Sequence, residues 1–337
     1  MNIYGITKEK LESYFESIGE KKFKATQVFE WLYQKRVKSI DEMTNIKKEI
    51  RERLKNDFLF QSLNLVKREI DTLTEKYLFE LADGEKIEAV LMRHDYGNSV
   101  CVSSQVGCNM GCKFCESGRL KKIRNLESYE MVCQILAIEE LTKERVDSVV
   151  IMGIGEPLDN YENVVDFIRI INDPKGIQIG ARHITLSTCG IVPKIKNLSD
   201  LPIQINLAIS LHAPNDAIRN LIMPISKAYA LPVLMDAIKE YIDKTNRRVT
   251  MEYVLLKGIN DQEKHAKELA RLLRGMNVYV NLIPYNETKN IEFEKSSKEA
   301  IDKFYNTLHQ EKINVTVRRE FGSKISAACG QLRSKEV

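Results

Sequence analysis

The sequence predicts an α/β fold, a partial barrel of parallel strands that is preceded along the chain by a small helical domain. From residue 127 onward, short runs rich in β-formers alternate with helical stretches, which is typical of parallel strands joined by crossover helices. With the run that ends near Ser104, they make about six or seven strand-and-helix units, too few for a closed eight-stranded barrel. Residues 1 to about 58 have helical periodicity, and 337 residues suffice for a large domain and a smaller one.

Helical spacing marks the N-terminal part. Apolar residues recur three and four positions apart there, at Leu11, Tyr14, Phe15, Ile18, Val28, Phe29, Trp31 and Leu32. Between residues 63 and 104 the pattern changes to short runs rich in β-formers, two of which are separated by the turn sequence ADGE. We therefore predict an accessory domain over residues 1–95, helical and then stranded, and a barrel domain over residues 96–337.

Later runs are the candidate strands of the barrel. They cover residues 148–152, 183–187, 205–211, 248–256, 278–283 and 314–319. The carboxyl ends of parallel strands share one edge of a barrel, and ligands of this architecture bind at that edge. Gly153 to Pro157, the sequence GIGEP, directly follows the first of these runs and is a candidate ligand-binding turn, although such a turn can also be structural.

Composition indicates an ordinary folded protein, with 43% hydrophobic and 29% charged residues. No run approaches the roughly 20 apolar residues of a membrane span. The N-terminal sequence lacks the apolar core of a signal peptide, so we expect a cytoplasmic protein with no membrane association. In that reducing compartment, an odd number of cysteines, seven here, favours metal or catalytic roles over a disulfide framework.

A net charge of +4 does not by itself indicate a nucleic-acid binder. The basic residues nevertheless gather in three clusters, each of which can be a solvated face or a contact to phosphate. The clusters are Arg119, Lys121, Lys122 and Arg124; Lys244, Arg247 and Arg248; and Arg318, Arg319 and Lys324.

Three cysteines stand close together directly after a predicted strand. Cys108, Cys112 and Cys115 form the run CNMGCKFC, whose thiolates can ligate three irons of one 4Fe-4S cluster and leave the fourth iron open. A structural zinc site is a weaker reading, because it would want a fourth ligand and His94 lies at no familiar zinc spacing. An electron-transfer ferredoxin would want four cysteines per cluster.

This C-x3-C-x-F-C run, with Phe114 before its last cysteine, resembles the signature of the radical S-adenosylmethionine superfamily. The resemblance implies a partial (β/α)6 barrel, one 4Fe-4S cluster and S-adenosylmethionine bound to the open iron. It further implies that reductive cleavage of this cofactor yields a 5′-deoxyadenosyl radical.

A closer resemblance, to the RlmN/Cfr family of adenosine methyltransferases, covers almost the whole chain. Its blocks follow in the family's order and include CVSSQVGC, IMGIGEPL, RHITLSTCGIVP, LAISLHAPND, VNLIPYN and AACGQLR. The N-terminal KATQVFEWLYQK is similar to the family's accessory helical domain. GIGEPL and NLIPYN resemble the RlmN branch more than the Cfr branch, which methylates carbon 8 of adenosine and confers antibiotic resistance.

The family resemblance implies roles for three further residues. Cys329 would take a methyl group from one S-adenosylmethionine, and the radical from a second molecule would activate that methyl for addition to adenine. Cys101 would then form a disulfide with Cys329 and free the product. Glu88 matches a family proton acceptor, a role that Cys101 can share. Without the resemblance, both cysteines would pass for buried apolar side chains and Glu88 for a surface residue.

The resemblance also implies the cofactor site and the partners. The residues that would bind S-adenosylmethionine are Gly155, Glu156, Ser187, Ser210, Leu211, His212 and Asn286. The implied substrate is 23S rRNA, with tRNA as a second candidate, methylated at carbon 2 of adenosine. We also expect an electron donor such as flavodoxin or ferredoxin, and a monomer. Cys133 and Cys189 keep the reading of buried free cysteines.

One segment departs from the family pattern. After Cys115 the sequence ESGRLKKI replaces the family's glycine-rich stretch, which keeps a carbon 8 outcome open and places positive charge beside the cysteines. Two other classes of function also stay open at this point. A non-catalytic RNA-binding protein would hold zinc in place of iron and sulfide and would not cleave S-adenosylmethionine. A radical enzyme acting on a small metabolite would leave Cys101 and Cys329 without a role and would turn over without RNA.

Overall fold

In the computed structural model, which describes residues 1–288, 290–318, 322 and 325–332, the barrel is built from parallel strands placed in sequence order. These strands are β4 (Gly97–Cys101), β7 (Ser148–Ile151), β8 (Ile184–Thr188), β9 (Asn206–Ser210), β10 (Val249–Leu255), β11 (Val278–Pro284) and β12 (Val315–Val317). Each pairs in parallel with its neighbours in this series. Within the described residues β12 pairs only with β11, so the barrel is open at that side, as predicted.

The predicted strand boundaries agree closely with the observed ones. Five of the six later runs end within one residue of an observed strand at both ends. The sixth run, 314–319, is longer than β12, and its last residue lies outside the described part of the chain. The runs of β-formers between helical stretches therefore located the barrel strands correctly.

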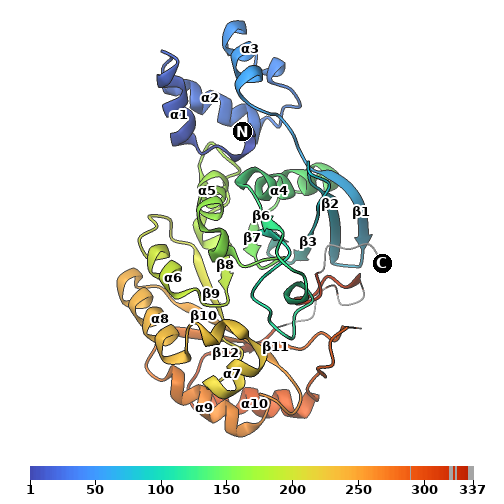
Figure 1. The fold of residues 1–337 in the computed structure, drawn as a ribbon, viewed down its shortest axis with the longest axis vertical. Helices are drawn as coiled ribbons and strands as arrows, with labels where there is room; N and C mark the ends of the chain where they lie inside the picture. The colour runs from blue at the N-terminus through green and yellow to red at the C-terminus, as the bar shows by residue number, and fades with distance from the viewer. Residues whose placement is uncertain (289, 319–321, 323–324, 333–337) are drawn as a thin grey trace.

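Helices cover the outside of the barrel (Figure 1). They are α4 (Ser128–Thr142), α5 (Tyr161–Asn172), α6 (Val192–Leu198), α7 (Asp216–Ile222), α8 (Leu231–Thr245), α9 (Glu263–Leu273) and α10 (Lys298–Gln310). Their apolar faces are buried, as Val164, Phe167 and Ile171 of α5 illustrate. α4 starts at a capping box in which Glu127 and Glu130 each bind the other's backbone N–H.

The N-terminal residues are helical, as predicted, and lie beside α4 and α5 (Figure 1). They form α1 (Lys8–Ser17), α2 (Phe23–Phe29), which runs into a π-helical turn (Glu30–Gln34), and α3 (Lys48–Asp57). The Ser128 hydroxyl of α4 donates a hydrogen bond to the carbonyl of Gly5 at 2.7 Å, and Lys8 forms an ion pair with Asp173 at 2.8 Å. These contacts fix the helical part against the outer face of the barrel.

Three antiparallel strands extend the parallel sheet at its β4 edge. They are β1 (Asn64–Ile70), β2 (Thr74–Glu80) and β3 (Lys86–His94), and β3 pairs with β4. A separate ribbon of β5 (Gln105–Val106) and β6 (Arg124–Asn125) follows β4. The boundary expected at residue 95 falls in the turn between β3 and β4, so the division into 1–95 and 96–337 stays a prediction.

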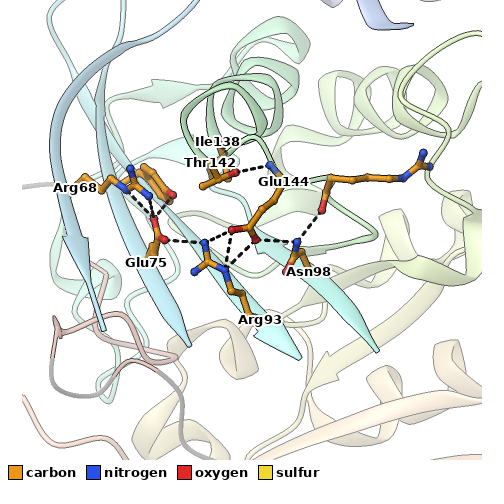
Figure 2. A network of polar contacts seen from close by, with 9 residues as sticks. Arg68, Glu75, Arg93, Asn98, Ile138, Thr142 and Glu144 are labelled. Carbon is orange, nitrogen blue, oxygen red and sulfur yellow. Dashed lines mark hydrogen bonds and ion pairs between the residues drawn. The ribbon is translucent and has the colours of Figure 1, made fainter. Parts of the chain in front are cut away.

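A network of charged side chains ties this extension together (Figure 2). Glu75 on β2 accepts hydrogen bonds from Arg68 on β1 at 2.7 Å and from Arg93 on β3 at 2.8 Å. Arg93 also binds Glu144, which follows α4, at 2.8 Å. Burial alone would raise the pKa of Glu75, but hydrogen bonds from Arg68, Tyr77 and Arg93 outweigh it and lower the pKa to about 2.

In the part of the chain that the structure describes, every helix is too short or too polar to cross a bilayer.

Candidate active site

The three clustered cysteines lie on the loop between β5 and β6. The N–H of Cys108 donates to the carbonyl of Leu120 at 3.1 Å, and the N–H of Cys115 donates to the carbonyl of Cys112 at 3.2 Å. Gly107 precedes the first cysteine with φ of +73°, and a Cβ there would lie 2.2 Å from the carbonyl oxygen of Lys121. Glycine is therefore required where the chain enters this loop.

All three thiols border one cavity and influence one another's ionisation. Burial raises the pKa of Cys108 to about 12, and the neighbouring Cys115 adds to that effect. Burial, then Cys115 and Cys108, raise the pKa of Cys112 well above its usual value. Among the described residues, no group of three or more His, Cys, Asp and Glu side chains converges on a point suited to one metal ion. The thiols instead surround a shared space of about 160 Å³.

Gly155 and Glu156 lie in the wall of this cavity, after the carboxyl end of β7. The Glu156 carboxylate accepts hydrogen bonds from the backbone N–H of Leu158 at 3.0 Å and of Cys189 at 2.8 Å. Burial raises its pKa despite these bonds. Gly155 has φ of +108°, and a Cβ there would lie 2.6 Å from the Cβ of Gln105. The turn thus brings a fixed carboxyl group and bare backbone to the cavity.

His212 also borders the cavity, after β9, in a left-handed backbone conformation with φ of 55°. Its Nδ1 accepts a hydrogen bond from the N–H of Val254 at 3.0 Å, and its ring meets that of Phe114 edge to face at 4.8 Å between centroids. Burial, then the positive charge of Arg219, lower its pKa to about 3. The ring is therefore neutral and carries its proton on Nε2.

The remaining expected cofactor residues divide into two groups. Ser187, Ser210 and Asn286 border the same cavity, from the carboxyl ends of β8, β9 and β11. Leu211 does not; it is fully buried in the core, and its carbonyl accepts a hydrogen bond from Arg219 at 3.3 Å. Any contribution of Leu211 to binding would come through its backbone.

The C-terminal segment 325–332 is attached directly to the cysteine loop. The N–H of Glu116 donates to the carbonyl of Gly330 at 2.8 Å, and the Ser117 hydroxyl donates to the carbonyl of Leu332 at 2.8 Å. Ala327 and Leu332 pack with Val90 of β3 in one apolar cluster. The ESGRLKKI stretch that departs from the family pattern therefore provides the anchor for this segment.

Cys329 and Cys101 meet in a second cavity beside the first. Both thiols border it, and Cys329 borders the first cavity as well. Burial raises the pKa of Cys101 to about 12; Cys329 adds to the effect and Arg318 opposes it. Both cysteines are free thiols, as are the other five. Two residues 228 positions apart in the sequence are thus close enough to interact.

Glu88 lies near this pair but not in the wall of either cavity. It is on β3, two residues before Val90, so by strand alternation it shares a face with a residue that borders the second cavity. Its side chain is buried and forms an ion pair with Lys76 at 3.3 Å. Glu88 is therefore not a surface residue, and its catalytic role stays a prediction.

Sequence reasoning gave three charged residues no role at these cavities, and one of them, Arg318, was noted only as part of a basic cluster. Arg318 borders both cavities directly after β12 and interacts electrostatically with Cys329, Glu252 and Cys101. Glu252 of β10 borders the first cavity and accepts a hydrogen bond from Asn281 at 2.8 Å. Its signal was a charged residue inside a run of apolar strand residues, and that of Arg318 was its position at a strand end.

Arg219, on α7, is the third missed residue. It is fully buried, its Nη2 donates to the carbonyl of Cys189 at 2.7 Å, and its Nη1 has no partner among the described residues. Its charge acts on Cys112. Arg219 does not border the first cavity, but a buried cation with an unused donor favours negative charge on the thiols beside it.

The donor set fits the cluster and cofactor that the sequence implied. Cys108, Cys112 and Cys115 would hold three irons, and sulfur is the donor that such clusters take. Cys189 also borders the cavity, but its thiol interacts with the Glu156 carboxylate. Carboxyl, hydroxyl, amide and imidazole groups gather at the same cavity, as an amino acid with an adenosyl group would require.

Three of the four basic residues in the first cluster have partners within the protein. Lys122 pairs with Asp159 at 2.7 Å, Arg124 pairs with Glu130 at 2.8 Å, and Arg119 donates to the carbonyl of Asn290. Those three charges are therefore engaged within the protein. Arg319 and Lys324 of the third cluster lie outside the described residues.

Comparison with known proteins identifies the family of this chain. Residues 1–59 match the ribosomal RNA large subunit methyltransferase N-terminal domain, and residues 102–270 match the radical SAM superfamily. The probable dual-specificity RNA methyltransferase RlmN of Spiroplasma citri is 55% identical over 99% of this chain and 97% of its own length. The protein of the same name from Staphylococcus aureus (strain JH9) is 53% identical over 99% and 93%.

Solved structures agree as well. A radical SAM methyltransferase from Sphaerobacter thermophilus superposes with a TM-score of 0.93 and 41% identity, covering 99% of this chain and 100% of that one. Streptococcus suis SuiB bound to S-adenosylmethionine, at 14% identity and a TM-score of 0.51 over 68% of this chain and 55% of its own, shares the fold. The chain belongs to the RlmN family of radical S-adenosylmethionine RNA methyltransferases.

Proposed function

We propose that this protein methylates carbon 2 of adenosine in 23S rRNA and in tRNA through a methylated Cys329. The observation that carries the proposal is the position of Cys329, which borders both the cavity of the three clustered cysteines and the cavity of Cys101. Relatives that are 53% and 55% identical are named dual-specificity RNA methyltransferases, which supports two kinds of RNA substrate.

The chemistry of the target explains why a radical route is needed. Carbon 2 of adenine is electrophilic and carries an unactivated hydrogen, so it does not attack a sulfonium methyl group. A 4Fe-4S cluster held by Cys108, Cys112 and Cys115 would supply an electron that cleaves S-adenosylmethionine to a 5′-deoxyadenosyl radical. Gly155, Glu156, Ser187, Ser210, His212 and Asn286, with the backbone of Leu211, would bind and orient that cofactor.

Cys329 would act as the methyl carrier. As a thiolate it can attack the methyl group of one S-adenosylmethionine and displace S-adenosylhomocysteine, and a second molecule would serve to activate the transferred methyl group. The guanidinium of Arg318, which interacts with both Cys329 and Cys101, would hold negative charge at this point. The segment that carries Cys329 is anchored on the cysteine loop, which keeps the carrier beside the radical source.

Cys101 would release the product. Once the methylene on Cys329 has bonded to carbon 2, the adduct would lose one electron, for which the oxidised cluster is the acceptor, and the proton from carbon 2. Attack by the Cys101 thiolate on the Cys329 sulfur would then break the bond between that sulfur and the methylene carbon and form a Cys101–Cys329 disulfide, and the released methylene carbon would take up a proton to become the methyl group. Glu88 or Cys101 would accept the proton. The disulfide would be transient, because each new turnover needs a free Cys329 thiol to accept the next methyl group.

The remaining expectations complete the proposal. An electron donor such as flavodoxin or ferredoxin would reduce the cluster and the disulfide, and the protein would work as a cytoplasmic monomer. Two S-adenosylmethionine molecules would be consumed per methylation.

Nucleoside analysis tests the proposal. Anaerobically prepared, cluster-loaded protein would be incubated with S-adenosylmethionine, a reductant and either a 23S rRNA fragment or a tRNA transcript, and the digested RNA analysed by mass spectrometry. We expect 2-methyladenosine from both RNAs. Finding 8-methyladenosine would instead indicate the chemistry of the Cfr branch, and methylation of only one RNA would contradict dual specificity.

A further inference from the structure

A polar cavity lies at the end of the barrel opposite the cysteines. It has a volume of about 710 Å³ and is bordered by Thr185, Asn206 and Thr250 at the amino ends of β8, β9 and β10. Pockets for small ligands commonly measure about 300–1,000 Å³. The cavity therefore has room for a ligand of nucleotide size.

Strand alternation shows that this cavity opens into the barrel interior. Thr185 is two residues before Ser187, and Thr250 is two residues before Glu252. Ser187 and Glu252 border the cavity of the three cysteines. Thr185 and Thr250 therefore point to the same inner face of the barrel, nearer the amino ends of the strands. The two cavities thus occupy opposite ends of one barrel.

Three arginines border this polar cavity. Arg182 precedes β8, and Arg247 and Arg248 precede β10, so the chain brings them together from sites 65 residues apart. Lys244, the third member of that basic cluster in the sequence, pairs instead with Asp200. Arg248 rests against the ring of Tyr279, with its guanidinium carbon 4.8 Å from the ring centroid.

These arginines lack the acidic partners that such a cluster would normally have. Among the described residues, none of the three forms an ion pair with a carboxylate, and the Nη1 of Arg247 is buried without a hydrogen-bond partner. Burial lowers the pKa of Arg247, and repulsion from Arg182 contributes to the same effect. Arg182 and Arg248 are exposed, so water screens part of the repulsion among the three charges, and an anion bound between them would offset the rest.

We propose that this cavity binds a phosphate group, held by the guanidinium groups of Arg182, Arg247 and Arg248. Arginine presents paired N–H donors that match phosphate oxygens, and the bordering hydroxyl and amide groups of Thr185, Gln204 and Thr250 can bind the rest of a ligand. The phosphate belongs either to a free nucleotide or phosphate ion, or to the backbone of the RNA substrate. The proposal does not depend on which base is methylated.

Calorimetric titration with inorganic phosphate, against chloride at equal ionic strength, tests the first source. The cluster-loaded wild-type protein, Arg247→Gln and Arg182→Gln would be compared. The matched control is Lys239→Gln, which removes one positive charge from the exposed face of α8, where Lys239 pairs loosely with Asp236 at 3.6 Å. We expect each arginine variant to bind phosphate about tenfold more weakly or worse, and the control to bind it like the wild type.

Equilibrium binding of a tRNA transcript at several salt concentrations tests the second source. If an RNA phosphate occupies the cavity, Arg247→Gln weakens RNA binding and lowers the salt slope by about one for each lost contact, while free phosphate binds weakly. If a small phosphate compound occupies it, RNA binding is the same in all four proteins. The proposal is overturned if the arginine variants match Lys239→Gln in both titrations.

Thermal unfolding without phosphate separates a binding role from a structural one. Because Arg247→Gln relieves repulsion, we expect the phosphate-free variant to be as stable as the wild type or more stable. A lower unfolding temperature would show that Arg247 supports the fold, and would contradict the proposal. Methyl transfer is measured separately, so failure here leaves the proposed reaction untouched.

Discussion

The two cysteine-bearing parts of the site are held in different ways. The loop with Cys108, Cys112 and Cys115 is closed by its own backbone hydrogen bonds and by the β5–β6 ribbon. The segment with Cys329 is held by bonds to that loop, at Glu116 and Ser117, and by apolar contacts to β3. The segment therefore depends on the loop for its position. A substitution in the loop should impair more steps of the reaction than a substitution in the segment.

Removing a cluster ligand should have the largest effect. We expect Cys112→Ala to lose the absorbance of the iron-sulfur cluster, cofactor cleavage and methylation together, with methylation falling at least about a thousandfold. Visible spectroscopy and product analysis of anaerobic protein check this. Cys133→Ala is the matched control, because Cys133 is buried on α4 and borders neither cavity. Cofactor cleavage that persisted in Cys112→Ala would contradict the assignment of the loop.

Removing the methyl carrier should have a narrower effect. We expect Cys329→Ala to lose methyl transfer but to keep its cluster absorbance and most of its cofactor cleavage, because only the carrier thiol is missing. The measurement is the yield of 5′-deoxyadenosine beside that of methylated nucleoside. If the cluster absorbance were lost together with methyl transfer, Cys329 would be needed to hold the cluster, and its assignment as the methyl carrier alone would be wrong.

Removing the resolving thiol should stop the reaction one step later. Cys101→Ala should accumulate protein covalently bound to RNA, because no thiol remains to displace the product from Cys329. Denaturing gel electrophoresis of protein and labelled RNA detects that species. Free methylated RNA at the wild-type rate would rule out the resolving role.

Loosening the segment should give a partial loss. Leu332→Ala removes an apolar contact with β3 and should lower methyl transfer about tenfold, while cofactor cleavage stays near the wild-type rate. Leu198→Ala on α6, where the side chain is also buried, is the control for a general loss of packing. Equal losses of transfer and cleavage in Leu332→Ala would show that loop and segment are not separable.

The smallest effect should come from a change in the antiparallel strands β1 to β3, which extend the sheet beside the strand of Cys101. Glu75→Gln should lower the free energy of unfolding at pH 7 by about 2 kcal/mol, because the ionised carboxyl is stabilised by Arg68 and Arg93. The folded pKa of about 2 lies below the usual value of 4.5, so this stabilisation is complete above about pH 5 and declines as the pH falls toward 2. Urea unfolding should show that the difference in free energy of unfolding between the wild type and Glu75→Gln is smaller at pH 4 than at pH 7.

Local patterns in the sequence predicted what is local in the structure. The spacing of three cysteines marked the loop between β5 and β6, and the end of a predicted strand marked Gly155 and Glu156. Ser187 and Ser210 came from the family resemblance and not from a local pattern. Glu252 and Arg219 were missed because their roles depend on which side chains face the barrel interior and which strands are neighbours. Those features follow from the assembled sheet and cannot be seen in one stretch of chain.

The basic clusters show the same limit. Lys122 and Arg124 looked available for phosphate, but Asp159 and Glu130, which follow them in the sequence, occupy them. Arg247 looked equivalent, yet it lacks any ion pair among the described residues. Charge counted along the sequence does not reveal which charges are already neutralised.

Peptide mapping of the methyl carrier tests the central claim most directly. Cluster-loaded protein would be incubated with S-adenosylmethionine bearing an isotopic label in its methyl group, without RNA, and digested for mass spectrometry. We predict one labelled methyl group on Cys329 and none on Cys101. Label on Cys101, or a protein that stays unlabelled while it still methylates RNA, would contradict the role assigned to the C-terminal segment.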